Sequence, residues 1–281
     1  MELRNHFRYH ARIHKKYGNP NNIIIVDRNS EDDTLEIARR YGCKILTSKS
    51  NLGTARVEGA RAAETELIGF VDSDVELTEG WVELLRHAWN GQELYKDVGV
   101  FGAYSEGPIV KDSPLVLYGR NGVFGCIITY RSLILDCPEM EKYSSDEDFA
   151  YGQCIFRKGL KWYIFPVVMR HHHDLTGISE YVRMRWHGAG LRMRDGFKLV
   201  NVRRIIGGAV VGIPMHNPNA NYLENWRIRM NYFLGYILYK RYYELNRSKK
   251  RRIPIYMLPK HFFSSSMADL AHLWPNFLNS S

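Results

Sequence analysis

Residues 67–74 read Leu67-Ile68-Gly69-Phe70-Val71-Asp72-Ser73-Asp74, an apolar run that ends in two carboxylates separated by one serine. A continuous apolar run of this length predicts a strand that is covered on both faces of a sheet. The run 23–26 has the same character and ends on Asp27. Because ligands bind beyond the carboxyl ends of strands in such sheets, we expect Asp27, Asp72 and Asp74 to share one crevice.

Helices are predicted between these strands. The pattern gives strands at 23–26, 44–47 and 67–71, with helices at 34–41, 53–64 and 79–90. Short links in this alternation predict an α/β fold whose mostly parallel sheet is flanked by helices. Further strands are expected at 98–104, 123–130 and 162–169, and a helix at 146–158. Later residues indicate mainly helix, so we expect a catalytic domain at 1–178 and a basic helical extension at 179–281.

The composition excludes several classes of protein. With 281 residues, 45% of them hydrophobic and 25% charged, the chain is neither disordered nor collagen-like. The most apolar stretch, 205–215, is about half of the roughly 20 residues that cross a bilayer. The N-terminus does not resemble a signal peptide. The four cysteines form no C-x-x-C pair, so we expect reduced thiols and a cytoplasmic location.

The charge is unevenly distributed. Residues 1–180 carry 22 Lys and Arg against 26 Asp and Glu, whereas residues 181–281 carry 17 against 4. Such a basic segment favours an anionic partner, either nucleic acid or acidic lipid headgroups. No nucleic-acid-binding module is recognisable, and the acidic first part would repel phosphates, so we expect no nucleic acid. The remaining partner is an anionic surface on the inner face of a membrane.

Two acidic pairs are candidates for chemistry. Asp72 and Asp74 offer hard oxygen ligands that suit Mg²⁺ or Mn²⁺, and such an ion can hold a diphosphate. The alternative is a solvated turn that caps the next helix. Glu147-Asp148 begins a predicted helix, where a carboxylate can act as a general base toward a hydroxyl. There the alternative is that both acids merely complement the helix dipole.

A run of three histidines follows the last predicted strand. His171, His172 and His173 cannot all bind one metal ion, because alternate side chains on a strand face opposite ways. One of them can add a nitrogen ligand to an ion held by Asp74. The alternative is a surface run without a role.

Taken in order, these motifs resemble those of family 2 glycosyltransferases over roughly residues 20–175. The string at 24–34 is similar to their "IVVDDGSTDGT" signature, and Asn51-Leu52-Gly53 with Ala55, Arg56 and Gly59 to "NxGxaxarNxG". The segment at 70–74 is similar to "FLDSD", Gly80-Trp81 to "PGWL", and Glu147-Asp148 with Arg157 and Gly159 to "ED…RxxG".

The resemblance implies a GT-A fold and inverting transfer of a sugar from a nucleotide-diphosphate donor to a hydroxyl of a glycan or lipid-linked saccharide. It assigns donor contacts to Asp27, Arg56 and Asp72, the Mg²⁺ or Mn²⁺ to Asp74 with a histidine of 171–173, and the base to Asp148. The alternatives are a nucleotide-sugar-binding protein with weakened catalysis, and transfer to a polyprenyl phosphate, which needs no base. A nucleotidyltransferase would need a glycine- and lysine-rich phosphate loop, which this sequence does not show.

The chain also departs from the family pattern. Members begin with a strand of the type "VSVVIPTYN", 25 to 30 residues before the signature strand. Here about twenty residues precede Ile23 and residues 1–17 indicate a basic helix, so we expect this strand to be missing or to lie upstream of Met1. Arg28 and Glu58 replace the family's usual Asp and Asn.

An amphipathic helix is predicted at 222–246, with one aromatic and apolar face built by residues spaced three and four apart. That face comprises Tyr222, Trp226, Met230, Phe233, Leu234 and Ile237. A polybasic run at 247–252 follows at once. Two readings stay open: an in-plane membrane anchor, or a helix that packs its apolar face against the catalytic domain.

Overall fold

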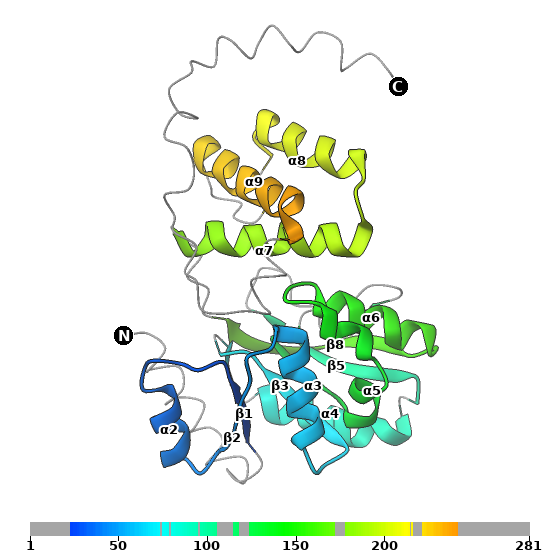
Figure 1. Cartoon of the computed structure of the whole chain (residues 1–281). Helices are drawn as coiled ribbons and strands as arrows, with labels where there is room; N and C mark the ends of the chain where they lie inside the picture. Colours follow the sequence, from blue (N-terminus) through cyan, green and yellow to red (C-terminus); the bar gives the residue numbers. More distant parts are fainter. Residues whose placement is uncertain are drawn as a thin grey trace, which may run out of the picture. The chain divides into compact units, whose positions relative to one another are not determined.

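A computed structural model of the chain describes residues 23–73, 75–78, 80–94, 96–105, 115–117, 124–171, 178–213, 215 and 221–240 (Figure 1). The first elements are β1 (Ile24–Asp27), α2 (Thr34–Arg40), β2 (Lys44–Thr47), α3 (Leu52–Ala62), β3 (Leu67–Val71), β4 (Val75–Glu76) and α4 (Gly80–Leu94). The next are β5 (Val98–Ser105), β6 (Leu115–Leu117), β7 (Cys126–Tyr130), α5 (Arg131–Leu135), the 3₁₀ helix η2 (Pro138–Lys142), α6 (Glu147–Arg157) and β8 (Lys161–His171). Helices α7 (Ile178–Asp195), α8 (Leu199–Val211) and α9 (Tyr222–Ile237) complete the order.

The strands form two sheets. The parallel pair β1–β2, joined through α2, is the crossover unit that the sequence predicts. The larger sheet has the order β3-β7-β5-β8-β4, with β6 beside β8. In it β5 and β8 run parallel, whereas β3–β7, β5–β7, β4–β8 and β6–β8 are antiparallel. The expected α/β class with a helical C-terminal region is confirmed, and the larger sheet is mixed because β7 returns beside β3.

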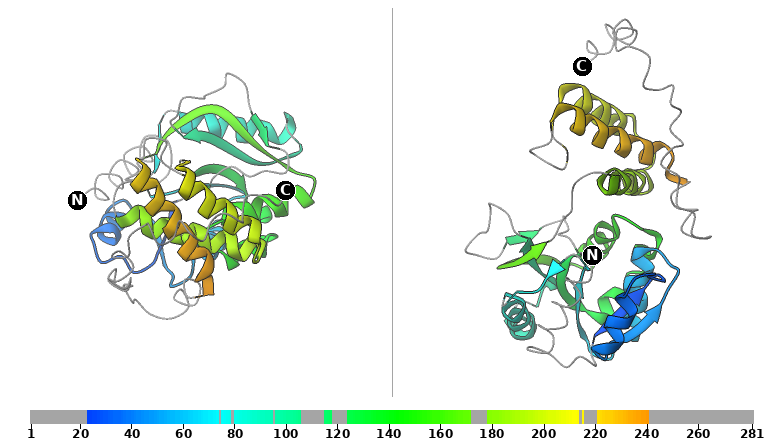
Figure 2. Two further views of the ribbon diagram at one scale, coloured as in Figure 1. Left: turned by 90° about the horizontal axis from the view of Figure 1, so that it is seen from above. Right: turned by 90° about the vertical axis from the view of Figure 1, so that its left-hand side faces the viewer.

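Two apolar layers cover the larger sheet. One contains Val57 of α3 and Tyr151 of α6 packed on Trp162, and the other contains Trp81 and Leu84 of α4. Figure 2 shows α4 on one side of this sheet and α6 on the other. Gly69 of β3 is needed for the second layer, since a Cβ there would lie 2.6 Å from the Trp81 ring.

The cysteines depart from expectation. Cys137 and Cys154 form a disulfide, with their Cα atoms 5.8 Å apart, so the prediction that all four are reduced thiols is wrong. The two cysteines are 17 residues apart in sequence and meet because η2 packs against α6. No local spacing of residues predicts this contact. Cys43 and Cys126 are free thiols. The expectation of a cytoplasmic location therefore loses the part of its support that came from reduced thiols.

The C-terminal helices pack on one another, with α9 between α7 and α8 (Figure 1). A Cβ at Gly235 of α9 would lie 1.9 Å from the carbonyl oxygen of Arg185, and one at Gly188 of α7 equally close to that of Tyr232. These glycines allow the two backbones to approach closely. In the described part of the chain, no helix is long and apolar enough to cross a membrane.

The expected boundary between the two domains, near 175–180, falls largely in residues outside the described ones and stays a prediction. The same holds for the basic helix expected at 1–17 and for the run at 247–252.

Candidate active site

Asp27 stands at the carboxyl end of β1 and is 5% exposed. Its side chain accepts hydrogen bonds from the Ser30 backbone N–H at 2.9 Å and from the Ser30 hydroxyl at 2.5 Å. Its backbone carbonyl accepts the Ser48 N–H at 2.8 Å. Ser30 therefore fixes the position of the Asp27 carboxylate, and α2 begins at Thr34, as the sequence predicts.

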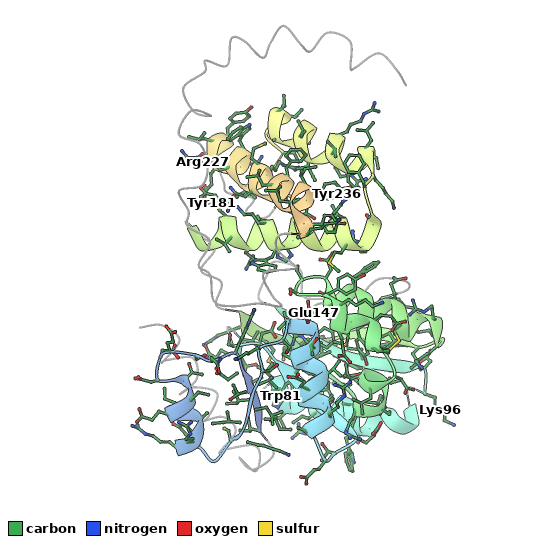
Figure 3. The ribbon with its side chains drawn as sticks, in the orientation of Figure 1. Trp81, Lys96, Glu147, Tyr181, Arg227 and Tyr236 are labelled. Atoms are coloured by element: carbon green, nitrogen blue, oxygen red, sulfur yellow. A yellow bond between two sulfur atoms is a disulfide. The ribbon has the colours of Figure 1, made fainter. Side chains whose placement is uncertain are left out.

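Arg56 connects two of the predicted site acids. It lies on α3, is 7% exposed, and donates from Nη2 to Asp72 Oδ1 at 2.9 Å and from Nε to Glu147 Oε1 at 3.2 Å. Its guanidinium also stacks 4.6 Å from the centre of the Phe124 ring. Asp72 directly follows β3, and Glu147 is the first residue of α6, beside α3 in Figure 3. The strand end and the start of α6 thus meet at one buried cation.

Asp148, the expected base, follows Glu147 on α6. Its Oδ1 accepts the Phe149 N–H at 2.7 Å. Burial, reinforced by the charge of Glu147, raises the pKa of Asp148 to about 7, while the Phe149 N–H and Arg56 oppose the rise. A carboxylate with this pKa is divided between its two forms near neutral pH, which is what proton removal from a hydroxyl requires.

The turn before α6 is held by α7, an arrangement that the sequence analysis missed. Asp146 has the left-handed φ of 69°, and Arg194 of α7 donates to its carboxylate at 3.3 Å. His187 Nδ1 lies 2.9 Å from the Ser145 hydroxyl. At Gly190 an added Cβ would lie 3.0 Å from the Ser145 carbonyl oxygen. Residues 187, 190 and 194 lie on one face of α7, so this face sets the conformation of the turn that leads to Asp148.

Burial also raises the pKa of Asp146, to about 6, with Glu147 and Asp195 adding to the rise and Arg194 opposing it. Asp146, Glu147 and Asp148 therefore form a run of acids whose mutual repulsion is offset by Arg194 on one side and Arg56 on the other.

The predicted metal ligands are described only in part. Asp74, His172 and His173 lie outside the described residues, and only the backbone of His171 is described. That backbone pairs with Val75 in the β4–β8 ladder, so His171 lies at the same end of the sheet as Asp72. Among the residues with described side chains, no three His, Cys, Asp or Glu gather as a metal site. The Asp72 carboxylate, about one-third exposed, is a hard oxygen ligand that fits Mg²⁺ or Mn²⁺.

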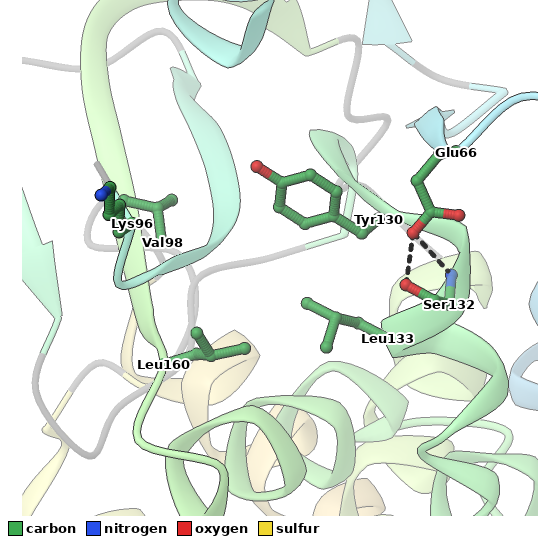
Figure 4. A pocket seen from close by; sticks show the side chains of 7 residues that line it. All are labelled: Glu66, Lys96, Val98, Tyr130, Ser132, Leu133 and Leu160. Atoms are coloured by element: carbon green, nitrogen blue, oxygen red, sulfur yellow. Dashed lines mark hydrogen bonds between the residues drawn. The ribbon is translucent and has the colours of Figure 1, made fainter. Parts of the chain in front are cut away.

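An open pocket of about 570 Å³ lies at the opposite end of the larger sheet (Figure 4). Its polar residues are Glu66, Lys96, Tyr130 and Ser132. Glu66 accepts hydrogen bonds from the backbone N–H and the hydroxyl of Ser132. This pocket adjoins the beginning of β3, whereas Asp72 follows its end, so the pocket is separate from the acids described above.

Comparison with known proteins bears on this arrangement. Residues 8–111 match the family model described as Glycosyl transferase family 2. The match spans less than half of the chain and confirms the resemblance inferred from the motifs.

Solved structures that match this chain include glucosyl-3-phosphoglycerate synthase from Mycobacterium tuberculosis. In its complex with Mn²⁺, uridine-diphosphate-glucose and phosphoglyceric acid, that protein is 15% identical in sequence to this chain. The alignment covers 62% of this chain and 69% of that chain, with a TM-score of 0.43. The complex with phosphoglyceric acid is 16% identical over the same shares, with a TM-score of 0.41. Another solved structure, of a mycobacterial protein, is 18% identical over 62% of this chain and 64% of that chain, with a TM-score of 0.43. These likenesses are too distant to carry an argument about activity.

Proposed function

We propose that this chain is an inverting, metal-dependent glycosyltransferase of the GT-A type that moves a sugar from a nucleotide-diphosphate donor to an acceptor hydroxyl. The match of residues 8–111 to family 2 glycosyltransferases supports the reaction class. The observation that carries the proposal is the Arg56 bridge between Asp72 and Glu147. This bridge joins Asp72, which follows β3 and is expected to contact the donor, to Glu147, which precedes the expected base Asp148.

In this proposal Asp148 takes the proton from the acceptor hydroxyl as the oxygen attacks the anomeric carbon. The attack occurs on the face opposite the departing diphosphate, so the configuration inverts and no covalent intermediate forms. The raised pKa of Asp148, about 7, suits this role because the base must accept a proton near neutral pH. Glu147 stays paired with Arg56 and orients the start of α6.

On the donor side, Asp27 is proposed to contact the base or ribose, and Asp72 the ribose or the metal. Arg56, 7% exposed and already engaged by two carboxylates, is proposed to hold Asp72 in position toward the donor. Asp72 and Asp74, with one histidine of 171–173, are the residues that would hold Mg²⁺ or Mn²⁺. The bound ion would offset the negative charge that grows on the departing diphosphate.

For the acceptor we propose a hydroxyl of a glycan or lipid-linked saccharide at the cytoplasmic face of a membrane. A base with its pKa near 7 favours this over a polyprenyl phosphate, whose oxygen is already ionised and needs no base. The basic composition of residues 181–281 supports an anionic surface as the place of reaction.

The test is a transfer assay with Mn²⁺, a set of uridine, guanosine and thymidine diphosphate sugars, and hydroxyl acceptors, with release of the nucleoside diphosphate as the readout. We expect Asp148→Asn to lose transfer by roughly 10²- to 10⁴-fold while it retains donor binding. The control Asp136→Asn removes an acid on the surface, paired with Lys158, and should leave the rate unchanged.

Three outcomes would count against the proposal. If Asp148→Asn transfers sugar at the wild-type rate, Asp148 is not the base. If Asp74→Ala transfers sugar at an unchanged rate, Asp74 does not hold a catalytic metal ion. Donor binding by the wild type without transfer to any hydroxyl would favour the alternative of a nucleotide-sugar-binding protein.

A further inference from the structure

The outer face of α8 has an unusual composition for a helix surface in water. We define the α8 outer face by the residues that share one side of the helix: Leu199, Val200, Arg203, Arg204, Gly207, Val210 and Val211. Its four aliphatic side chains are between 50% and 73% exposed. The two arginines are exposed as well, and a Cβ at Gly207 would meet nothing within 4 Å. A solvated helix normally presents polar side chains here, whereas this face carries only apolar and cationic ones.

The opposite face of α8 is used for packing. Gly208 meets Arg229 of α9 so closely that a Cβ would lie 2.3 Å from its guanidinium nitrogen. Arg229 in turn donates to the Ile213 carbonyl at 2.9 Å, and the Tyr222 hydroxyl donates to the Val210 carbonyl at 3.0 Å. The orientation of α8 about its axis is thereby fixed, with Leu199, Val210 and Val211 directed away from α9.

Helix α9 contains most of the segment that the sequence offers as a membrane anchor. Helix α9 packs between α7 and α8 with Asn225, Ile228, Arg229, Gly235 and Tyr236 buried. None of the six residues of its predicted apolar face is fully buried, and Tyr222 and Ile237 are 53% and 45% exposed. The main packing partners of α9 are α7 and α8, which belong to the expected extension and not to the expected catalytic domain, so neither of the two readings is confirmed. A further exposed apolar surface lies on α8, whose sequence overlaps the most apolar stretch of the chain.

The charges on α8 indicate what covers this face. Residues 199–211 contain no Asp or Glu, Lys198 stands immediately before them, and the exposed Phe197 and Ile213 extend the apolar surface at both ends. A second copy of the chain would bring four arginines together, which opposes self-association. Anionic lipid complements the arginines, and the aliphatic side chains can enter the boundary between headgroups and acyl chains.

We propose that the α8 outer face binds the surface of an anionic lipid bilayer, with the helix lying in the plane of the membrane. The inference deepens the membrane contact in the proposed function and rests on it for its biological role. Binding is measured without donor or acceptor, so it can fail while sugar transfer survives, and transfer can fail while binding survives.

The experiment is flotation of the full chain with vesicles of phosphatidylcholine that contain phosphatidylglycerol, at two salt concentrations. We expect Arg203→Gln/Arg204→Gln to weaken partitioning by roughly 20- to 30-fold. The matched control is Arg39→Gln/Arg40→Gln, which removes an adjacent exposed arginine pair from α2. Val210→Ser/Val211→Ser should weaken binding by roughly tenfold or more, since it removes the inserting side chains.

A label separates this surface from the basic run at 247–252. Bimane on Val211→Cys, in a Cys43→Ser background, should shift to shorter wavelength when anionic vesicles are added, whereas the same label on Trp89→Cys of α4 should not. Equal loss in the two arginine pairs, no shift at position 211, or a concentration-dependent dimer that buries the label without lipid would each overturn the proposal.

Discussion

Replacing Arg56 tests whether the buried bridge organises the site. Arg56→Met removes a cation that is 7% exposed and leaves the Glu147 side chain, 8% exposed, without its partner. Removing one member of a buried ion pair costs about 3–5 kcal/mol, because the remaining charge stays desolvated. The pair with Asp72, whose side chain is 33% exposed, adds less than about 1 kcal/mol. We therefore expect the free energy of unfolding to fall by about 4 kcal/mol.

The double variant Arg56→Met/Glu147→Gln supplies the internal control. In the double variant the side chain at 147 carries no charge, so its burial without Arg56 costs less, and most of the lost stability should return. Arg61→Met is the matched variant on the same helix. Arg61 pairs with Glu141 at the surface, with the two side chains 57% and 27% exposed, so its loss should cost under about 1 kcal/mol.

The measurement is equilibrium unfolding in urea, followed by circular dichroism at constant pH and salt. If Arg56→Met loses no more stability than Arg61→Met, or if the double variant is no more stable than Arg56→Met alone, the account of a buried bridge is refuted.

Four further predictions concern Asp148, Gly190 and the disulfide. Because its pKa is raised from 3.8 to about 7, native Asp148 binds a proton that the unfolded chain has lost, so stability falls as the pH rises through that window. Asp148→Asn should thus unfold at higher urea than wild type at pH 8 but not at pH 4, and equal midpoints at pH 8 would contradict this. For the wild type, transfer should decline below a pH of about 7, and a flat profile would argue against the base. Gly190→Ala places a methyl 3.0 Å from the Ser145 carbonyl oxygen and should lower kcat more than it changes the donor KM, unlike Gly207→Ala, which meets open space. In Cys137→Ser/Cys154→Ser the free energy of unfolding should fall by about 3 kcal/mol, since the disulfide spans 17 residues. An unchanged midpoint of urea unfolding would show that the disulfide does not stabilise the fold.

Continuous apolar runs allowed the early elements to be predicted from sequence. The strand expected at 67–71 is β3 over the same residues, and the helix expected at 34–41 is α2, which ends one residue earlier. Each such run is long enough to bury a strand, and each is bounded by polar or glycine residues that stop it. Short strands carry too few residues for a pattern, so β4 and β6 were not predicted.

Contacts between distant residues were the part that sequence did not disclose. Arg56 and Glu147 are 91 positions apart, and although each stands in a motif, nothing local indicates that they pair. The left-handed Asp146 and its partner Arg194 depend in the same way on how α7 crosses the turn. On α8, the sequence marks the apolar stretch at 205–215, but which side faces solvent is decided by the contact of Gly208 with Arg229.

In the described residues no ladder of hydrogen bonds joins β1 to β3, and α3 makes the connection instead. Gly59 allows this helix to approach β1, since an added Cβ at Gly59 would lie 3.3 Å from the Val26 side chain. One turn earlier on the same helix, Arg56 forms ion pairs with Asp72 and Glu147. Helix α3, eleven residues long, therefore links β1, the strand that carries Asp27, to Asp72 after β3 and to Glu147 of α6. A displacement of α3 would therefore alter both its packing on Val26 and the pairing of Arg56 with Asp72 and Glu147.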